Sequence, residues 1–262
     1  ALWQVELEED SRDLTSFRTP SGLYRFTRLP MGLKTASGVF CRYLDNILGS
    51  LRYEDVLSYL DDVLIASATF ERHISSLDKV LTKMSEAGLT LGVKKTILAE
   101  SETKFLGHVV DENGLRPDPK KLQAVRDMAV PSTATELRGA IGLLSYYRKF
   151  IPNFTKIAEP LRQMLQDTAR WKRKVEWSAT ELAALNELRE RLLQDATLDH
   201  PNWDYPYEVH TDASISGVSA ILTQKIDNRE HVVSFASRCL TKAEKSYTIP
   251  ELEALAMLWS AH

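Results

Sequence analysis

Two adjacent carboxylates, Asp61 and Asp62, lie between two short apolar runs at residues 56–58 and 63–66. Runs of this length are typical of buried strands, so they predict a hairpin that carries both acids at its turn. Hard divalent cations such as Mg2+ prefer oxygen ligands, which paired carboxylates supply. An Asp-Asp pair is also an ordinary turn signal. The pair therefore indicates either a solvated turn or a divalent-cation site, and the surrounding elements must decide between the two.

Strand-like and helix-like patterns alternate in the first half of the chain. Strands are expected where apolar residues alternate or run together, and helices where they recur every three or four positions. In chain order we expect strands at 3–7 and 15–29, a helix at 35–48, the hairpin at 56–66, a helix from 70 to 88 and a strand at 103–110. A turn at Asn113 and Gly114 ends this region, which we predict to be α+β.

Helix start signals are frequent in the second half of the chain. Asp118 followed by Pro119 predicts one helix start, and Thr133 with Glu136 predicts a capping box for the next helix. The other expected elements are a helix at 156–166, a linker at 171–177, a helix capped by Ser178 and Glu181, strands at 206–211, 217–225 and 231–236, and a helix from residue 250.

The composition is that of an ordinary globular protein, with 262 residues, 44% hydrophobic and 26% charged. No apolar run reaches membrane-spanning length, so we expect no membrane partner. The two cysteines, Cys41 and Cys239, are far apart and have no metal-binding spacing. This pattern excludes a disulfide framework and favours a reducing compartment.

The charge is distributed unevenly along the chain. The net charge is −3, but residues 113–175 hold 13 Lys and Arg against 5 Asp and Glu, so this segment carries +8 and the remainder −11. A basic segment within an acidic chain predicts either a solvated helical surface or a surface that binds a polyanion.

Several stretches of the sequence, taken in order, resemble one protein family. They lie at residues 29–40, 59–62, 87–95, 105–108, 114–121, 142–154, 211–214 and 251–255. Together they resemble the reverse transcriptase and ribonuclease H region of the Pol polyprotein of Ty3/gypsy-type LTR retrotransposons, over nearly the whole chain. The resemblance implies a right-hand polymerase palm with part of the fingers and a helical thumb, followed by the N-terminal part of an α/β ribonuclease H-like domain. The implied domains are residues 1–112 (palm with partial fingers), 113–175 (basic helical thumb), 176–199 (connecting helix) and 200–262 (ribonuclease H-like).

In that family a Tyr-x-Asp-Asp motif in the palm supplies two of three metal-binding acids, and Asp61 and Asp62 match it. The implied chemistry is nucleotidyl transfer assisted by two Mg2+ or Mn2+ ions. The implied nucleotide-binding residues are Leu2, Met31, Gly32 and Lys95. The glycine would allow close backbone approach. The lysine lies near a family lysine that serves as a general acid, and an ordinary surface lysine is the alternative.

The resemblance also implies contacts with a primer and a duplex. The implied residues are Phe105, Leu106, Gly107, Arg116, Arg148 and Lys149. The first three resemble the primer grip, and a core strand would give the same pattern. The basic residues would hold backbone phosphates, which requires charge and not sequence readout. The tyrosines at positions 146 and 147 are expected to be core residues rather than base-stacking residues.

Residues 200–262 resemble the start of a ribonuclease H domain. Asp212 at the end of an expected strand and Glu251 near the start of the last helix match its first two catalytic, metal-binding acids. The alternatives are a strand-end turn for the aspartate and a first-turn acid that the helix dipole favours for the glutamate.

The sequence departs from the family pattern at several points. Leu2 stands where members usually have an aromatic residue that excludes the ribose 2′-hydroxyl, and Ser37 and Cys41 replace a proline and a glutamine. The first palm aspartate would lie four residues before Ala1, and the later ribonuclease H acids would lie beyond His262. We therefore expect an excerpt of a polyprotein that needs an upstream segment for primer extension.

Two functions follow from these observations as hypotheses. The first is an RNA-directed DNA polymerase with attached ribonuclease H, whose partners are an RNA or DNA template with its primer and deoxynucleoside triphosphates. The second is a retroelement remnant that binds nucleic acid or another partner without catalysis. The resemblance implies an intracellular location, in a cytoplasmic virus-like particle or the nucleus.

Overall fold

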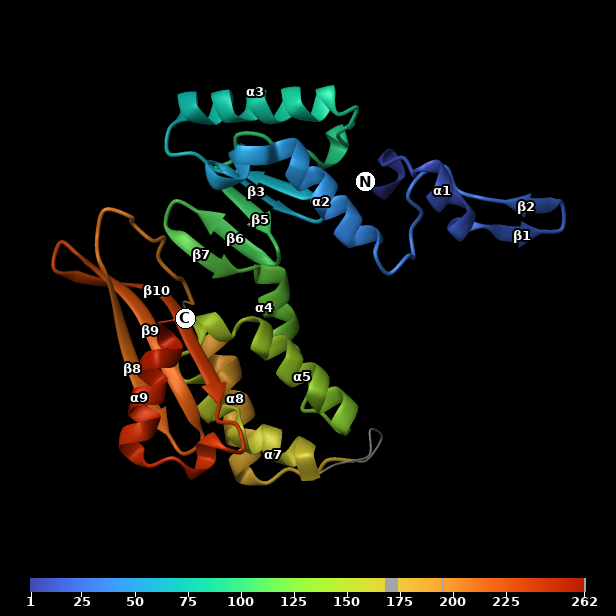
Figure 1. Ribbon diagram of the computed structural model, residues 1–262. Coiled ribbons are helices and arrows are strands. Elements are labelled where there is room, and N and C mark those ends of the chain that lie inside the picture. The colour runs from blue at the N-terminus through green and yellow to red at the C-terminus, as the bar shows by residue number, and fades with distance from the viewer. Residues whose placement is uncertain (168–173, 195, 262) are drawn as a thin grey trace. The chain divides into compact units, whose positions relative to one another are not determined.

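The computed structural model describes residues 1–167, 174–194 and 196–261. The chain forms two compact units, Ala1–Ala99 and Glu100–His262 (Figure 1). The sequence places the end of the palm at residue 112, whereas the first unit ends before the next sheet begins. The four domain boundaries expected from the resemblance remain predictions. Residues 171–173 of the expected linker at 171–177 lie outside the described residues.

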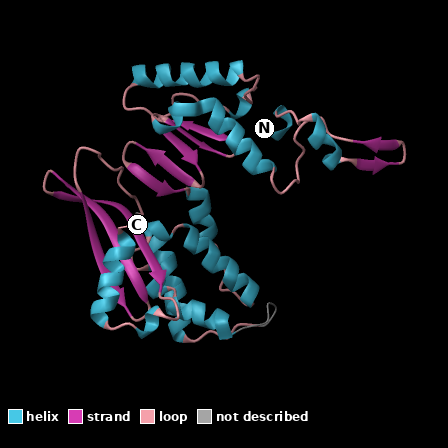
Figure 2. Ribbon diagram, viewed as in Figure 1, coloured by secondary structure: helices cyan, strands magenta, loops and turns pink. Residues whose placement is uncertain are grey.

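In the first unit, two helices pack with a two-stranded hairpin. Helix α2 (Ala36–Leu48) contacts helix α3 (Phe70–Glu86) and strand β3 (Val56–Tyr59), which pairs with β4 (Asp62–Ile65). The expected hairpin and both helices are confirmed. The remaining elements are η1 (Leu2–Gln4), α1 (Glu9–Arg12), η2 (Asp13–Thr15), β1 (Phe17–Thr19), β2 (Gly22–Tyr24), η3 (Gly49–Tyr53) and η4 (Val93–Lys95) (Figure 2).

The core of the first unit explains why the hairpin is held in place. Phe40, Leu44 and Leu48 recur at helical spacing on α2 and pack with Val56 of β3 and Met84 of α3. Each is almost fully buried. Burying an apolar side chain of this size stabilises the fold by about 1.5–3 kcal/mol. The hairpin strand β3 is therefore anchored at its first residue, while its other end carries the turn with the two acids.

The N-terminal segment differs from the expected strands. Residues 3–7 do not form a strand; a short 3-10 helix (η1) begins there, and only Glu6 makes an isolated bridge with Arg28. The expected strand at 15–29 is a short hairpin, β1 and β2. Pro20 lacks a backbone N–H and Gly22 has φ of 144°, so the chain reverses there instead of continuing. Two acids in the first turn, Glu9 and Asp10, favour helix α1.

The second unit begins with a three-stranded antiparallel sheet. Its strands are β5 (Glu102–Phe105), β6 (His108–Asp111) and β7 (Gly114–Pro117), in the order β5-β6-β7. The prediction of one strand at 103–110 was wrong, because Leu106 (φ 49°) and Gly107 (φ 70°) form a tight turn in its middle. Apolar residues continue through that turn, so the strand pattern gives no sign of it. The turn at Asn113 and Gly114 is confirmed.

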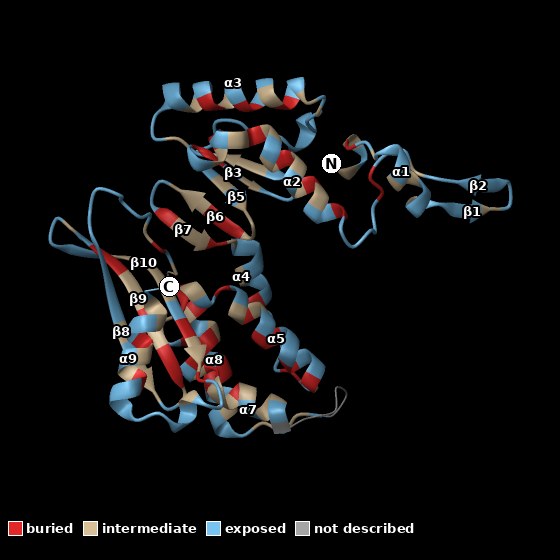
Figure 3. Cartoon of the chain, viewed as in Figure 1, coloured by how far each residue is buried: buried red, intermediate tan, exposed pale blue. Residues whose placement is uncertain are grey.

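Helices follow this sheet and share one core. They are α4 (Pro119–Arg126), α5 (Ala134–Tyr146), η5 (Arg148–Phe150), α6 (Phe154–Ile157), α7 (Glu159–Asp167) and α8 (Ala179–Leu193). Leu137 and Leu144 of α5 pack in this core with Leu185 and Leu188 of α8, and Figure 3 shows the buried positions as bands along these helices. The expected helix at 156–166 is divided into α6 and α7.

The expected helix caps are confirmed at several points. The side chain of Asp118 accepts from the N–H of Lys120, and Thr133 accepts from the N–H of Glu136. Ser178 and Glu181 form a reciprocal capping box at the start of α8. Such caps satisfy backbone donors that have no partner within the helix. These signals are local, which is why they could be read from the sequence.

The chain ends in a second antiparallel sheet with a helix on it. Strands β8 (Tyr207–Ser214), β9 (Gly217–Ile226) and β10 (Arg229–Cys239) lie in the order β10-β9-β8, and α9 (Ile249–Ser260) packs on β8 and β9. The short helix η6 (Glu244–Ser246) lies between β10 and α9. The three expected strands and the final helix are confirmed. Among helices of the described residues, none combines the length and apolar character of a membrane span.

Candidate functional site

The turn of the β3–β4 hairpin presents two free carboxylates. Tyr59 pairs with Asp62, so Leu60 and Asp61 form a two-residue loop, with Leu60 in the left-handed region at φ 53°. Asp61 and Asp62 are both exposed. Within the described residues, neither carboxylate has a hydrogen-bond or ion-pair partner. Both remain available to a cation or to water.

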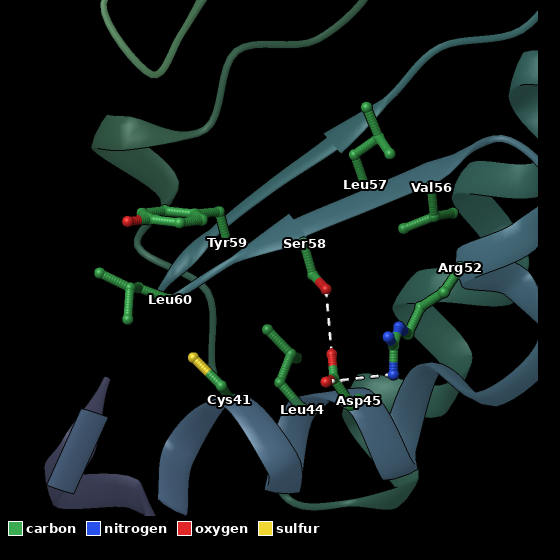
Figure 4. Close-up of a pocket in the computed structure, with 9 residues that line it drawn as sticks. All are labelled: Cys41, Leu44, Asp45, Arg52, Val56, Leu57, Ser58, Tyr59 and Leu60. Atoms are coloured by element: carbon green, nitrogen blue, oxygen red, sulfur yellow. Dashed lines mark hydrogen bonds and ion pairs between the residues drawn. The ribbon is translucent and has the colours of Figure 1, made fainter. Parts of the chain in front are cut away.

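A pocket of about 230 Å3 lies between α2 and β3, next to this turn (Figure 4). Its lining residues are Cys41, Leu44, Asp45, Arg52, Val56, Leu57, Ser58, Tyr59 and Leu60. Within it, one Asp45 oxygen accepts from Ser58 Oγ at 3.2 Å and the other pairs with Arg52 Nη1 at 3.1 Å. The negative charge of Asp45 in this pocket is therefore already paired with the positive charge of Arg52.

An ion pair between the buried Asp55 and the exposed Arg72 holds the other end of β3. The carboxylate of Asp55 accepts from Arg72 Nε and from Ser76 Oγ, both at 2.7 Å, at the start of α3. The Arg72 hydrogen bond lowers the pKa of Asp55 despite its burial. This contact links α3 to the strand that ends at the two acids. The sequence analysis missed it, although Arg72 and Ser76 have the one-turn spacing of a helix face.

The residues expected to bind nucleotide are dispersed over the first unit. Leu2 is partly buried against its core, Met31 is exposed, and Gly32 has φ of 93° with open space where a side chain would begin. Lys95 is exposed at the end of η4. None of these four lines the pocket beside the hairpin. Among the described residues, no three His, Cys, Asp or Glu side chains gather as a metal site.

The Leu106–Gly107 turn of the second unit is surrounded by hydrogen-bond donors. The hydroxyl of Tyr146 donates to the carbonyl of Leu106 at 2.5 Å, and that of Tyr147 donates to the carbonyl of Gly107 at 2.9 Å. The ring of His108 lies 2.7 Å from the Leu106 carbonyl through Nδ1. The expectation of a core residue is confirmed for Tyr147, which is 1% exposed, and is wrong for Tyr146, which is 53% exposed. Their spacing in the sequence gave no sign of these hydrogen bonds.

The basic residues expected to hold a duplex differ in how free their charges are. Arg116 forms ion pairs with Glu102 at 2.6 Å and with Asp111. Arg148 is exposed. Lys149 is partly buried, its Nζ lies 5.4 Å from the Phe150 ring centre, and burial lowers its pKa. Arg148 is therefore the member of this set with the most accessible charge.

The two acids expected in the last region lie on neighbouring elements. Asp212 is exposed on β8, opposite Ser219 of β9, and Glu251 is exposed in the first turn of α9. The Glu251 carboxylate accepts from the N–H of Thr248 at 2.7 Å and from its hydroxyl at 2.8 Å, which lowers the pKa of Glu251. One carboxylate oxygen of this glutamate therefore serves the capping box.

Comparisons with known proteins found matching families for an N-terminal and a C-terminal part of the chain. Residues 1–110 match the family of reverse transcriptases (RNA-dependent DNA polymerases), and residues 177–262 match the RNase H-like domain found in reverse transcriptase. The chain is 36% identical over 258 residues to the Pol polyprotein from transposon 297 and 34% identical over 265 residues to that from transposon gypsy, both of Drosophila melanogaster. It is 31% identical to the transposon Tf2-3 polyprotein of Schizosaccharomyces pombe.

Each of these alignments covers 98% of the chain, but the chain spans only 24%, 25% and 19% of the respective polyproteins. Among solved structures, a foamy viral protease-reverse transcriptase in complex with double-stranded DNA superposes with a TM-score of 0.85 at 24% identity. That match covers 99% of this chain and 45% of the viral chain. It confirms the expected α+β reverse transcriptase fold. Residues 1–110 therefore belong to the reverse transcriptase family, and residues 177–262 belong to the ribonuclease H-like domains found with it in retrotransposon Pol polyproteins.

Proposed function

We propose that this chain supplies the hairpin acids, the duplex-holding helices and part of the ribonuclease H site of an RNA-directed DNA polymerase. One observation carries the proposal: Asp61 and Asp62 are an exposed carboxylate pair without protein partners in the described chain, at the hairpin of a reverse transcriptase domain. The transposon relatives support the expected intracellular location, in the cytoplasm or nucleus.

The hairpin fits a hard divalent cation. Both donors are carboxylates, which Mg2+ and Mn2+ prefer, and their mutual repulsion at the turn would be relieved by a bound cation. Asp61 and Asp62 would hold it, whereas Asp45 is engaged with Arg52. The cation, when bound, stabilises the charge that develops during nucleotidyl transfer.

The chain's own residues would orient the substrates. The open backbone at Gly32 leaves room for a deoxynucleoside triphosphate beside Met31. The exposed ammonium group of Lys95 can donate a proton to the triphosphate or attract its negative charge. Leu2 packs into the core of the first unit. A leucine there excludes a ribose 2′-hydroxyl less strictly than an aromatic ring would, so sugar selection would be weaker.

The second unit would hold the primer and its template. Foamy viral reverse transcriptases of the same fold were solved with double-stranded DNA and with an RNA/DNA hybrid, which supports a nucleic-acid duplex as the partner of this chain. The exposed guanidinium of Arg148 and the partly buried Lys149 can contact backbone phosphates. The turn at Phe105, Leu106 and Gly107 would contact the primer end.

The ribonuclease H part would use Asp212 and Glu251. Both are exposed on packed elements, β8 and α9. The second glutamate oxygen has no partner among the described residues and stays available to a divalent cation. The residues present fit a cation in this part as oxygen donors.

Titration with Mn2+ tests the metal proposal directly. The double variant Asp61→Asn/Asp62→Asn should lower Mn2+ affinity of the chain by at least about tenfold, because both charged donors are lost. The matched control is Asp227→Asn, an exposed aspartate in the two-residue β9–β10 turn. Equal affinity in the parent and the double variant would reject the site.

Primer extension tests the activity. In the polyprotein region that contains this chain, each single Asn variant of the hairpin should reduce deoxynucleotide incorporation on an RNA template by about a thousandfold. The Asp227→Asn control should retain the parent rate. An inactive parent that binds duplex normally would favour the non-catalytic remnant.

A further inference from the structure

The turn at Leu106 and Gly107 is tied to the end of helix α5 by two consecutive tyrosine hydroxyls. Tyr146 binds the first carbonyl of the turn and Tyr147 binds the second. The backbone N–H of Asp118 also donates to the Gly107 carbonyl, at 3.0 Å. The two carbonyls thus receive hydrogen bonds from residues 11 and 40 positions later in the sequence. These bonds form only where the turn is folded against the end of α5.

Burial explains one of these hydroxyl bonds but not the other. Tyr147 is 1% exposed, so its hydroxyl needs a protein partner to offset the loss of water. Tyr146 is 53% exposed, and water could satisfy its hydroxyl without cost. Its bond to Leu106 is therefore not required by burial. The bond instead holds the Leu106 carbonyl in a turn whose two residues both have left-handed backbone conformations.

The rings around the turn leave little freedom. The His108 ring stacks on the Tyr146 ring with 5.6 Å between centres, and the Tyr147 ring meets the Tyr146 ring edge-on at 4.9 Å. A Cβ on Gly107 would lie 3.3 Å from the Tyr147 hydroxyl and 3.4 Å from the Tyr146 ring. Both its φ of 70° and these close contacts therefore favour glycine at this position.

We propose that Tyr146 and Tyr147 are positioning residues that fix the Leu106–Gly107 turn for the primer end. Arg148 and Lys149 follow them directly, so the segment that holds the turn also carries the basic residues. A primer–template held through its phosphates would then present its 3′ end at a constant place. This inference rests on the proposed function, because it assumes that a duplex binds here.

The test maps where the primer end lies on the full chain. A primer–template carries 4-thiothymidine at the primer 3′ terminus, is bound to the protein and is photocrosslinked, and mass spectrometry locates the adduct. We expect crosslinks within residues 105–107 of the parent. In Tyr146→Phe we expect their yield to fall by about fivefold, the factor that loss of one hydrogen bond produces, with duplex affinity unchanged.

Three further variants sharpen the result. Tyr146→Phe/Tyr147→Phe and Gly107→Ala should lower the yield further, and Tyr207→Phe on β8 is the matched loss of a tyrosine hydroxyl elsewhere in the unit. Thermal unfolding of Tyr146→Phe should match the parent, since that side chain is largely exposed. Parent-like crosslinking in Tyr146→Phe, or parent crosslinks outside the turn, would overturn the inference while leaving duplex binding intact. Failure of the parent to bind the duplex would instead reject the proposed function, and the inference with it.

Discussion

Single side chains in this protein carry structural and proposed chemical roles at once. Glu251 is the clearest case, because one of its oxygens closes the capping box of α9 while the other has no partner in the described part of the chain. The two ring nitrogens of His108 also differ, since Nδ1 contacts the turn carbonyl while Nε2 is buried without a partner among the described residues. Substitutions that separate the two roles are therefore more informative than alanine.

Glutamine at position 251 should separate capping from chemistry. A capping box accepts Glu or Gln at this position, so Glu251→Gln should leave the melting temperature nearly unchanged, while Glu251→Ala should lower it. If the glutamate also binds a catalytic cation, Glu251→Gln should abolish Mn2+-dependent cleavage of RNA in a hybrid by the polyprotein region that contains the chain.

The matched control for this prediction is Glu181→Gln, which makes the same change in the capping box of α8. It should alter neither stability nor cleavage. Full cleavage activity in Glu251→Gln would assign that glutamate to capping alone.

The stability of the second unit should depend on pH through His108. The side chain is 8% exposed, and burial, followed by the positive charge of Lys149, lowers its pKa below the ordinary histidine value of 6.5. The unfolded chain therefore binds a proton before the folded chain does. The free energy of unfolding should be highest above about pH 6.5 and should decrease as the pH falls through the lowered pKa of the folded state.

Chemical denaturation between pH 5 and 8 measures this effect, and an NMR titration of the His108 ring gives its pKa without a variant. His108→Asn keeps a donor for the Leu106 carbonyl and removes the titration, so its stability should vary less with pH. An NMR pKa at or above 6.5 would contradict the prediction.

At the scale of elements, the second unit joins a sheet, a bundle of helices and a second sheet with α9 on its face. The basic residues at the end of α5 and on β7 differ in how accessible their charges are, because different side chains surround them. Arg148 follows α5 with an exposed guanidinium, whereas Arg116 on β7 is bracketed by Glu102 and Asp111. Charge counted along the sequence therefore overstates the charge available to a polyanion.

The salt dependence of duplex binding should reveal this difference. Arg148→Gln should lower the slope of log K against log salt by about 0.9, the contribution of one phosphate contact. Arg116→Gln should lower it by less, since its charge is already shared between two carboxylates. Fluorescence anisotropy over a salt series measures both slopes, and an unchanged slope in Arg148→Gln would assign that residue to a solvated surface.

At the scale of the whole molecule, the chain consists of two compact units that divide at Ala99. Residues 91–101, which include the short helix η4, are all exposed, and Ala99 itself has φ of 53°. Few buried contacts and an exposed backbone mark a segment that opens readily. The division after Ala99 lies before the predicted end of the palm at residue 112, and the four domain boundaries remain predictions.

Limited proteolysis should find this boundary. Trypsin should cut after Lys94 or Lys95 before it cuts within helices α3, α4 or α5, because cleavage requires an exposed segment that can unfold locally. Mass spectrometry of the early fragments identifies the site, and Lys94→Gln/Lys95→Gln should remove that cut. Initial cleavage inside α3 of the parent would show that the first unit, and not the boundary, opens most easily.

Local chemistry was enough to predict the hairpin at Asp61 and Asp62, helices α2 and α3, and the cap at Ser178 and Glu181. These features depend on apolar periodicity and on residues within four positions of each other, which any reader of the sequence can see. The family resemblance then predicted that the two acids belong to a polymerase palm.

The tertiary structure alone decided the features that depend on distant partners. The break between β5 and β6 is set by two left-handed residues whose carbonyls are bound by tyrosines forty positions later. The pairing of Arg116 and the neutralisation of Asp45 by Arg52 likewise arise only when separate elements meet. An apolar strand pattern continues unchanged through a tight turn, and a charge count does not record which charges are already paired. For that reason these contacts could not be derived from the order of the residues.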